Sequence, residues 1–160
     1  MNIGKWLSPL ALALLLGACA TNSHHDKAVA VIETAGYDDN YETLLGQTMD
    51  ELPNEYRYSS LTQTQLKNVI RKHLPLTKVK QIAADYYADN LSEQEMDLLV
   101  SINASQDPLK MAAMFMSSAE GLALAAKMND LQHGQGRDAK ERMAGVMTAI
   151  ERELDTLTDG

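Results

Sequence analysis

The chain contains very little of several residue types on which other protein classes depend. Its 160 residues include one cysteine, one tryptophan and one phenylalanine, and aromatic side chains make up 5% of the total. A lone cysteine excludes a disulfide framework. The apolar bulk comes mainly from Leu, Ala and nine Met residues, which favour helices over strands. Because no useful stretch alternates apolar and polar residues and no repeat recurs, the sequence predicts a single all-α domain.

An excess of basic residues is also missing. The chain has 14 Lys and Arg against 22 Asp and Glu, which gives a formal net charge of −8. An acidic chain without a basic stripe repels phosphate backbones, so nucleic acid is excluded as a partner. We expect that this charge serves solubility.

The motifs that mark common enzyme classes do not occur. The sequence has no Gly-x-Ser-x-Gly, HExxH or CxxC motif, no phosphate loop and no dinucleotide fingerprint. We therefore expect a protein that is not an enzyme and that uses no cofactor.

The first 18 residues have the pattern of an export signal. A short start containing Lys5 precedes an apolar run whose uninterrupted part, Leu10 to Leu16, is far shorter than the roughly 20 residues of a membrane-spanning helix. The small residues Gly17 and Ala18 follow, as is typical before the cleavage site of an export signal. We expect residues 1–18 to be removed before the protein folds.

The only cysteine, Cys19, follows this segment directly. Residues 16–19 read Leu-Gly-Ala-Cys, which resembles the lipobox of bacterial lipoproteins. The resemblance implies a diacylglyceryl group on the Cys19 sulfur, cleavage just before Cys19 and acylation of the new amine. Ala20, in place of an aspartate, implies transfer to the outer membrane, with the protein facing the periplasm. The alternative is an ordinary cleavage site at Ala18-Cys19-Ala20, which would give a soluble secreted protein.

The residues after Cys19 are polar. We expect residues 19–27 to form a lipidated tether and residues 28–158 to form the helical domain. His24 and His25 lie in the expected tether, where two adjacent side chains of a flexible segment make a poor metal site. A solvated linker is the preferred interpretation.

Helix boundary signals divide the domain into six or seven amphipathic helices. Predicted helix starts include capping boxes at Thr62–Gln65 and Ser92–Glu95, an Asp107 cap with Pro108 at the first helical position, and a start at Thr77 after Pro75. Leu91 and Met96 form a predicted hydrophobic staple across the Ser92 cap. Gly36 predicts the end of the first helix.

Residues 109–128 are apolar nearly all round and predict one central, mostly buried helix. The glycine-containing stretch 132–136 predicts a hinge. After the hinge, residues 137–157 predict an amphipathic helix whose apolar stripe includes Val146, Ile150, Leu154 and Leu157. We expect this helix to dock on its own domain, and docking on a partner is the alternative.

Two stretches resemble a family of small exported bacterial proteins known as domain of unknown function twenty fifty-nine. The first is "KAVAVIETAGYDDNYETLLGQTMDELP", and the second is "YYADNLSEQEMDLLVSINASQDPLK", residues 86–110. Tyr86, Ser92, Glu93, Glu95, Ser105 and Lys110 fall on matching positions, whereas Ile102, Asn103, Gln106 and Pro108 depart from the pattern. The resemblance spans roughly residues 27–128 and implies a helical fold in the cell envelope, with no activity and no functional residue to carry over.

Three residue groups offer chemistry. Six methionines gather within 37 residues and could bind Cu(I), but core packing explains their helical spacing better; they are Met111, Met114, Met116, Met128, Met143 and Met147. Helix capping explains the carboxylates Asp38, Asp39, Glu93, Glu95 and Asp97. His73 and His133 have no partner motif in the sequence.

The sequence therefore predicts a lipid-anchored periplasmic module of the cell envelope without catalytic activity. Its expected partners are the bilayer, through acylated Cys19, and an envelope protein. The alternatives are a carrier of a soft metal or small apolar ligand and, third, an envelope enzyme. We expect no catalytic residue, metal ligand or cofactor-binding residue.

Overall fold

The computed structural model describes residues 23–52, 55–134 and 138–159. This part of the chain forms eight α-helices and contains no strand, which confirms the predicted all-α class. The first helix covers residues 23–34. It is followed by α2 (Tyr37–Asp50), the 3₁₀ turn η1 (Glu55–Tyr58), α3 (Gln63–His73), α4 (Leu76–Asn90), α5 (Glu93–Asn103), α6 (Pro108–Met116), α7 (Ala119–Gln132) and α8 (Ala139–Thr158).

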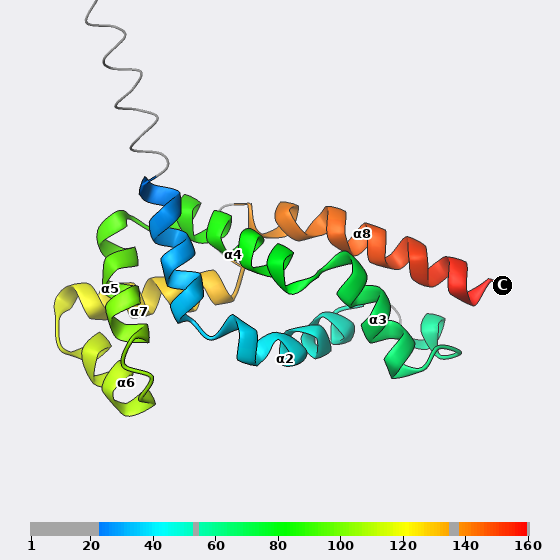
Figure 1. The fold of residues 1–160 in the computed structure, drawn as a ribbon, viewed down its shortest axis with the longest axis horizontal. Coiled ribbons are helices and arrows are strands. Elements are labelled where there is room, and N and C mark those ends of the chain that lie inside the picture. The colour runs from blue at the N-terminus through cyan, green and yellow to red at the C-terminus, as the bar shows by residue number, and fades with distance from the viewer. Residues whose placement is uncertain (1–22, 53–54, 135–137, 160) are drawn as a thin grey trace, which may run out of the picture.

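The molecule is elongated and has two groups of helices joined by α4 (Figure 1). One buried cluster is contributed by α2, η1, α3, α4 and α8, and it contains Leu45, Leu52, Tyr58, Val69, Ile70, Leu74, Val79, Val146, Ile150 and Leu154. The other involves the helix over residues 23–34, α4, α5 and α7, and it contains Ala28, Val31, Ile32, Ala84, Leu91, Met96, Leu99, Leu124 and Leu131. We call these the α8 cluster and the α5 cluster. Because Val79 and Ala84 of α4 belong to different clusters, α4 is the element shared by both.

Local capping signals gave the most accurate predictions. The Thr62 and Ser92 side chains accept hydrogen bonds from the backbone N–H groups of Gln65 and Glu95, which complete both capping boxes. The Asp107 carboxylate caps α6, with Pro108 at its first position. By contrast, α4 begins at Leu76 after Pro75, not at Thr77, and has no side-chain cap.

The prediction of one buried helix over residues 109–128 is wrong. The segment divides into α6 and α7, because the Ser118 hydroxyl accepts a hydrogen bond from Gly121 N–H and begins a new helix. Gly121 permits the tight turn, since a Cβ there would lie 2.4 Å from the carbonyl oxygen of Phe115. None of the residues of α6 is buried. This division also explains why eight helices form instead of six or seven.

The helix over residues 23–34 begins within the segment that we expected to be a polar tether. His24 Nε2 lies 2.8 Å from the carbonyl oxygen of Ala88, and His25 Nε2 lies 3.0 Å from the Asp85 carboxylate. These contacts fix the histidines against α4. The two histidines therefore belong to a helix and not to a flexible linker, because residues 23–27 are already helical.

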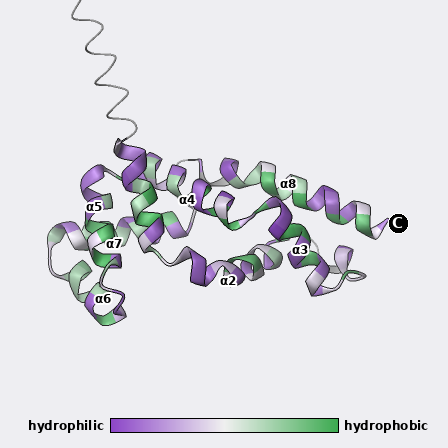
Figure 2. Ribbon diagram, viewed as in Figure 1, coloured by the Kyte–Doolittle hydropathy of each residue, from purple (hydrophilic) through white to green (hydrophobic). Residues whose placement is uncertain are grey.

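The C-terminal helix docks on its own domain, as we expected. Hydrophilic and hydrophobic residues alternate along α8 (Figure 2), and Val146, Ile150 and Leu154 are buried in the α8 cluster. Leu157, predicted to share this stripe, is 47% exposed at the last turn. The carboxylate of Glu153 accepts hydrogen bonds from Lys72 and lies 2.7 Å from His73 Nε2, both at the end of α3.

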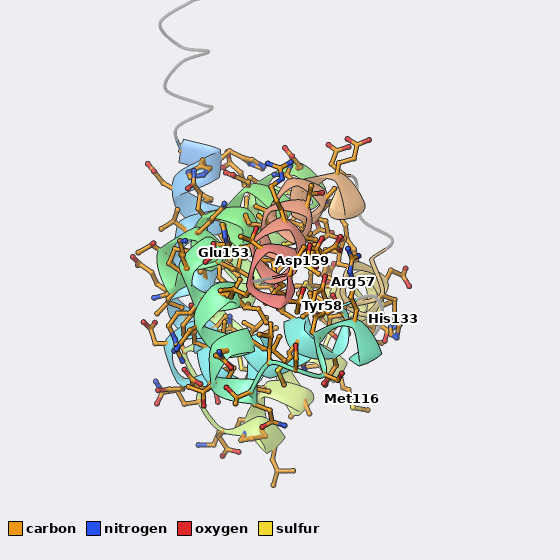
Figure 3. The ribbon with its side chains drawn as sticks, turned by 90° about the vertical axis from the view of Figure 1, so that its right-hand side faces the viewer. Arg57, Tyr58, Met116, His133, Glu153 and Asp159 are labelled. Atoms are coloured by element: carbon orange, nitrogen blue, oxygen red, sulfur yellow. The ribbon has the colours of Figure 1, made fainter. Side chains whose placement is uncertain are left out.

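A second polar contact fixes the same end of α8 to the 3₁₀ turn. The Tyr58 hydroxyl donates to the Asp155 carboxylate at 3.2 Å, and Arg57 forms an ion pair with the same carboxylate at 2.9 Å. Figure 3 shows Arg57 and Tyr58 beside this end of α8. The apolar stripe of α8 is therefore occupied within the chain.

Candidate functional site

The helices α6 and α7 expose large apolar side chains that the sequence predicted to be buried. Leu109 is 82% exposed, Met116 is 73% exposed and Leu122 is 54% exposed. Exposed alanines occupy the neighbouring positions on the same two helices: Ala112, Ala113, Ala119, Ala123 and Ala126. We call these eight residues the α6–α7 surface. The eight residues lie on two helices that pack side by side, and contiguous apolar surface is typical of an interaction site.

The spacing of these residues follows the helical repeat. Leu109, Ala112, Ala113 and Met116 recur at intervals of three and four and form one stripe along α6. Ala119, Leu122, Ala123 and Ala126 repeat the pattern on α7, which packs beside α6. Two adjacent helices therefore each leave an apolar stripe without cover from the described part of the chain.

The α6–α7 surface carries almost no charge. Residues 108–126 include one cation, Lys110, and one anion, Glu120, in a chain with a net charge of −8. Lys110 lies 4.0 Å from Asp107 within its own helix. The surface is thus neutral, and its small alanines leave room for the close approach of another helix.

The α6–α7 surface is remote from the start of the helix over residues 23–34. Residue 23 lies at the top of both views, whereas α6 lies at the bottom, where Met116 projects outward (Figures 1 and 3). The helix between residues 23 and 34 alone spans about 18 Å at 1.5 Å per residue. In Figure 1 the start of this helix and α6 lie at the same end of the long axis, on opposite sides of it.

The structure distributes the six methionines over separate environments. Met143 and Met147 pack against the α8 cluster, and Met128 packs against the α5 cluster. Met114 lines a shallow hollow beside Ser117, and Met116 points into solvent. Met111 is half-buried in α6. This distribution favours packing for Met128, Met143 and Met147.

The carboxylates at the helix starts have ion-pair partners. Asp38 pairs with Lys80, Asp97 pairs with Lys27 at 2.5 Å, and Glu95 pairs with Lys127 at 2.8 Å. Burial raises the pKa of Glu95, but the Lys127 hydrogen bonds and the Ser92 cap outweigh it, so the pKa is lowered overall. These groups hold helices together instead of facing a common cleft.

The histidines are likewise distributed over the fold. His73 contacts Glu153. His133, at the end of α7, places its Nδ1 atom 2.7 Å from the carbonyl oxygen of Asn129 in the same helix. Within the ranges that the structure describes, no three His, Cys, Asp or Glu side chains are grouped so that they could hold a metal ion.

Cys19 and the predicted signal segment lie outside the described residues, as do residues 135 and 136 of the predicted hinge over residues 132–136. The described part of the hinge contains Gly134, whose φ is +71°, in the left-handed region that favours glycine. None of the helices described here is both long and apolar enough to cross a bilayer.

Comparison of the chain with protein-family models, with curated proteins and with solved structures finds no match. The resemblance to the exported family stays a prediction. Function must therefore be inferred from the surfaces and cavities of this chain.

Proposed function

We propose that the protein is a lipid-anchored module of the cell envelope that binds an apolar helix of an envelope protein through the α6–α7 surface. The proposed anchor is acylated Cys19 in the outer membrane, with the helical domain in the periplasm. The observation that carries the proposal is the exposure of Leu109 and Met116, at 82% and 73%. No catalytic role is proposed.

Exposed side chains of this size favour association. Complete burial of a leucine side chain stabilises a complex by about 1.5–3 kcal/mol. Because 82% of Leu109 is exposed, most of that stabilisation would come from its burial against a partner. The Leu122 side chain, half-buried on the neighbouring helix, adds a second contact.

The position and charge of the surface support a protein partner. Acyl chains on Cys19 would contribute about 0.8 kcal/mol per buried CH₂ and hold the molecule at the end where residue 23 lies. At that end of the long axis, α6 would then lie on the side away from the anchor. Two copies of this chain would each bring a net charge of −8, so repulsion disfavours self-association relative to a different, apolar partner.

The proposal is tested by purification of the full chain from solubilised envelopes. We expect a defined protein to accompany the wild type and to be lost from a Leu109→Asp, Leu122→Asp double variant. The matched control is an Ala144→Asp, Thr148→Asp double variant, which places the same two charges at exposed positions of α8. Equal recovery with all three proteins would contradict the proposal.

Two other outcomes would also contradict it. Recovery of a second copy of the chain alone would indicate self-association. Recovery of lipid alone by the α6–α7 surface would indicate a membrane contact. Circular dichroism of the double variant should match that of the wild type, since both leucines are largely exposed.

A further inference from the structure

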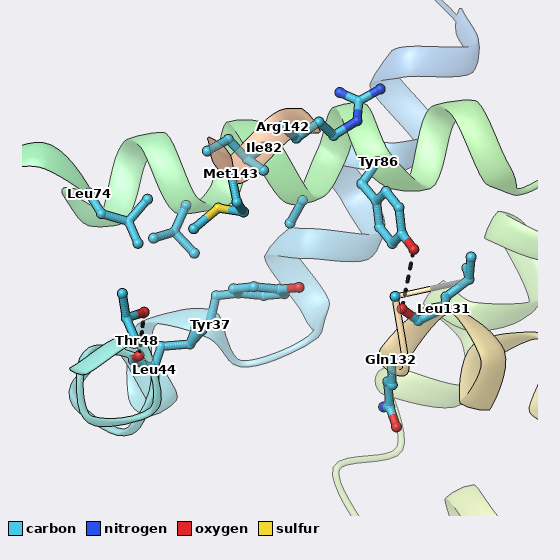
Figure 4. A pocket seen from close by; sticks show the side chains of 13 residues that line it. Tyr37, Leu44, Thr48, Leu74, Ile82, Tyr86, Leu131, Gln132, Arg142 and Met143 are labelled. Carbon is cyan, nitrogen blue, oxygen red and sulfur yellow. Dashed lines mark hydrogen bonds between the residues drawn. The ribbon is translucent and has the colours of Figure 1, made fainter. Parts of the chain in front are cut away.

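A cavity of about 360 Å³ lies between the two hydrophobic clusters. Its walls come from α2, α4, α7 and α8, and most of its lining side chains are apolar; they include Tyr37, Leu44, Leu74, Ile82, Tyr86 and Met143. Figure 4 shows α4 along one side of the cavity, with Tyr86 and Ile82 on the cavity side of the helix. Cavities of this volume and character, between packed helices, are typical small-molecule sites.

The cavity is a consequence of the two-cluster architecture. Tyr37 packs against both clusters, and its ring lies along one wall with the hydroxyl directed to the side of Tyr86 (Figure 4). Leu74 and Val79 belong to the α8 cluster, whereas Leu131 belongs to the α5 cluster. The cavity thus occupies the junction that neither cluster fills.

The hydroxyl groups around the cavity are already bonded within the protein. The Thr48 hydroxyl donates to the carbonyl oxygen of Leu44 at 2.9 Å, and the Tyr86 hydroxyl donates to that of Leu131 at 3.2 Å (Figure 4). Tyr37 and Tyr87 share a hydrogen bond between their hydroxyls, and burial raises the pKa of both phenols. A ligand therefore meets neutral walls whose hydroxyl donors are satisfied.

Among the described residues that line the cavity, Arg142 is the only one with a charged side chain. Its guanidinium is directed away from the cavity in Figure 4 and forms an ion pair with Asp89 of α4. Its Nε atom is buried and has no hydrogen-bond partner in the described part of the chain. The positive charge of Arg142 is thus balanced by Asp89 outside the cavity.

We propose that this cavity binds a small neutral apolar molecule, such as a medium-chain alcohol. The volume equals that of about twelve water molecules at roughly 30 Å³ each, and a methylene group is of similar size. A chain of about ten carbons with one oxygen fits that volume. The hydrocarbon would lie among the Leu, Ile and Met side chains that line the cavity.

A neutral head group is favoured over an ionised one. A carboxylate entering the cavity would lose its hydration, and Asp89 already compensates the charge of Arg142. We expect decan-1-ol to bind with about tenfold higher affinity than decanoate at pH 7. The inference is independent of the proposed partner of the α6–α7 surface.

The test is ¹³C-methyl-methionine NMR of the full chain in lipid nanodiscs. Met143 lines the cavity, whereas Met116 is 73% exposed on α6, so the two methyl groups serve as reporter and internal control. The Met143→Leu variant assigns the reporter resonance. Decan-1-ol should shift the Met143 resonance saturably and leave that of Met116 in place. An unmoved Met143 resonance, or equal shifts of both resonances, would overturn the proposal.

A cavity-filling variant provides the second arm. Ala83 lines the cavity, and Ala83→Leu should weaken decan-1-ol binding at least about tenfold by occupying its volume. Ala144→Leu makes the same change at an exposed position of α8 and should bind as the wild type does. Undiminished binding by Ala83→Leu, or binding of decanoate as tight as that of decan-1-ol, would overturn the proposal. If Ala83→Leu does not fold, the proposal is tested by the decan-1-ol titration of the wild type, followed through the Met143 and Met116 resonances.

Discussion

Two leucines of α7 provide a sharp test of which side of this helix is buried. Leu122 and Leu124 are two positions apart in the same helix, and their exposed fractions are 54% and 1%. Replacement of each by alanine removes the same atoms and leaves helix propensity almost unchanged. The two substitutions therefore differ mainly in how much buried contact they remove.

The expected loss of stability follows from that difference. Leu124 belongs to the α5 cluster, and Leu→Ala at a fully buried site costs about 2–5 kcal/mol through lost transfer free energy and a residual cavity. At Leu122 about half of the side chain is already in water, so we expect a loss of about 1 kcal/mol or less. The difference between the two variants should be at least about 1 kcal/mol.

The assay is urea unfolding of the full chain, followed by circular dichroism at 222 nm. Leu124→Ala should lower the unfolding midpoint strongly at an unchanged denaturant slope, while Leu122→Ala should stay close to the wild type. Equal losses in the two variants would refute the buried and exposed sides assigned to α7. The exposure of the α6–α7 surface would then have to be abandoned.

Three further outcomes are expected. Removal of the Thr62 or Ser92 cap by alanine should each lower the free energy of unfolding by about 1 kcal/mol in the same urea assay, and no loss at either position would contradict the capping boxes. The hydrogen bonds from Lys72 hold the pKa of Glu153 below its ordinary value of 4.5, so this contribution to stability is present above that pH and is lost as the pH falls through the lowered pKa. Glu153→Gln should flatten the acid limb of the stability profile below pH 4.5, and an unchanged limb would contradict this role. Cys19→Ser should abolish fatty-acid labelling and release the protein from membranes, whereas retained labelling would contradict the anchor.

Local chemistry made much of the fold predictable. The capping boxes at Thr62 and Ser92, and the Asp107 cap of α6, each depend on residues within one helical turn. Such hydrogen bonds are encoded by short spacing, and the structure confirms them. The predicted docking of the last helix is also confirmed, because its apolar period matches a buried face of the α8 cluster.

The exposed surface could not be predicted in the same way. Residues 109–128 are apolar on every side, and composition alone does not distinguish a buried helix from two helices that leave a face to a partner. The available signal was Ser118 followed three residues later by Gly121, a cap and a close approach inside the apolar run. The cavity was equally hidden, because it arises where two clusters meet and not from any one segment.

The most direct measurement of the proposed function is photo-crosslinking in intact cells from position 116. A benzophenone amino acid in place of Met116 should capture one defined envelope protein, and the adduct should disappear when Leu109→Asp is added. The same probe at Thr148, exposed on α8, should capture nothing comparable. An adduct of equal yield from both positions, or none from position 116, would contradict a partner bound at the α6–α7 surface.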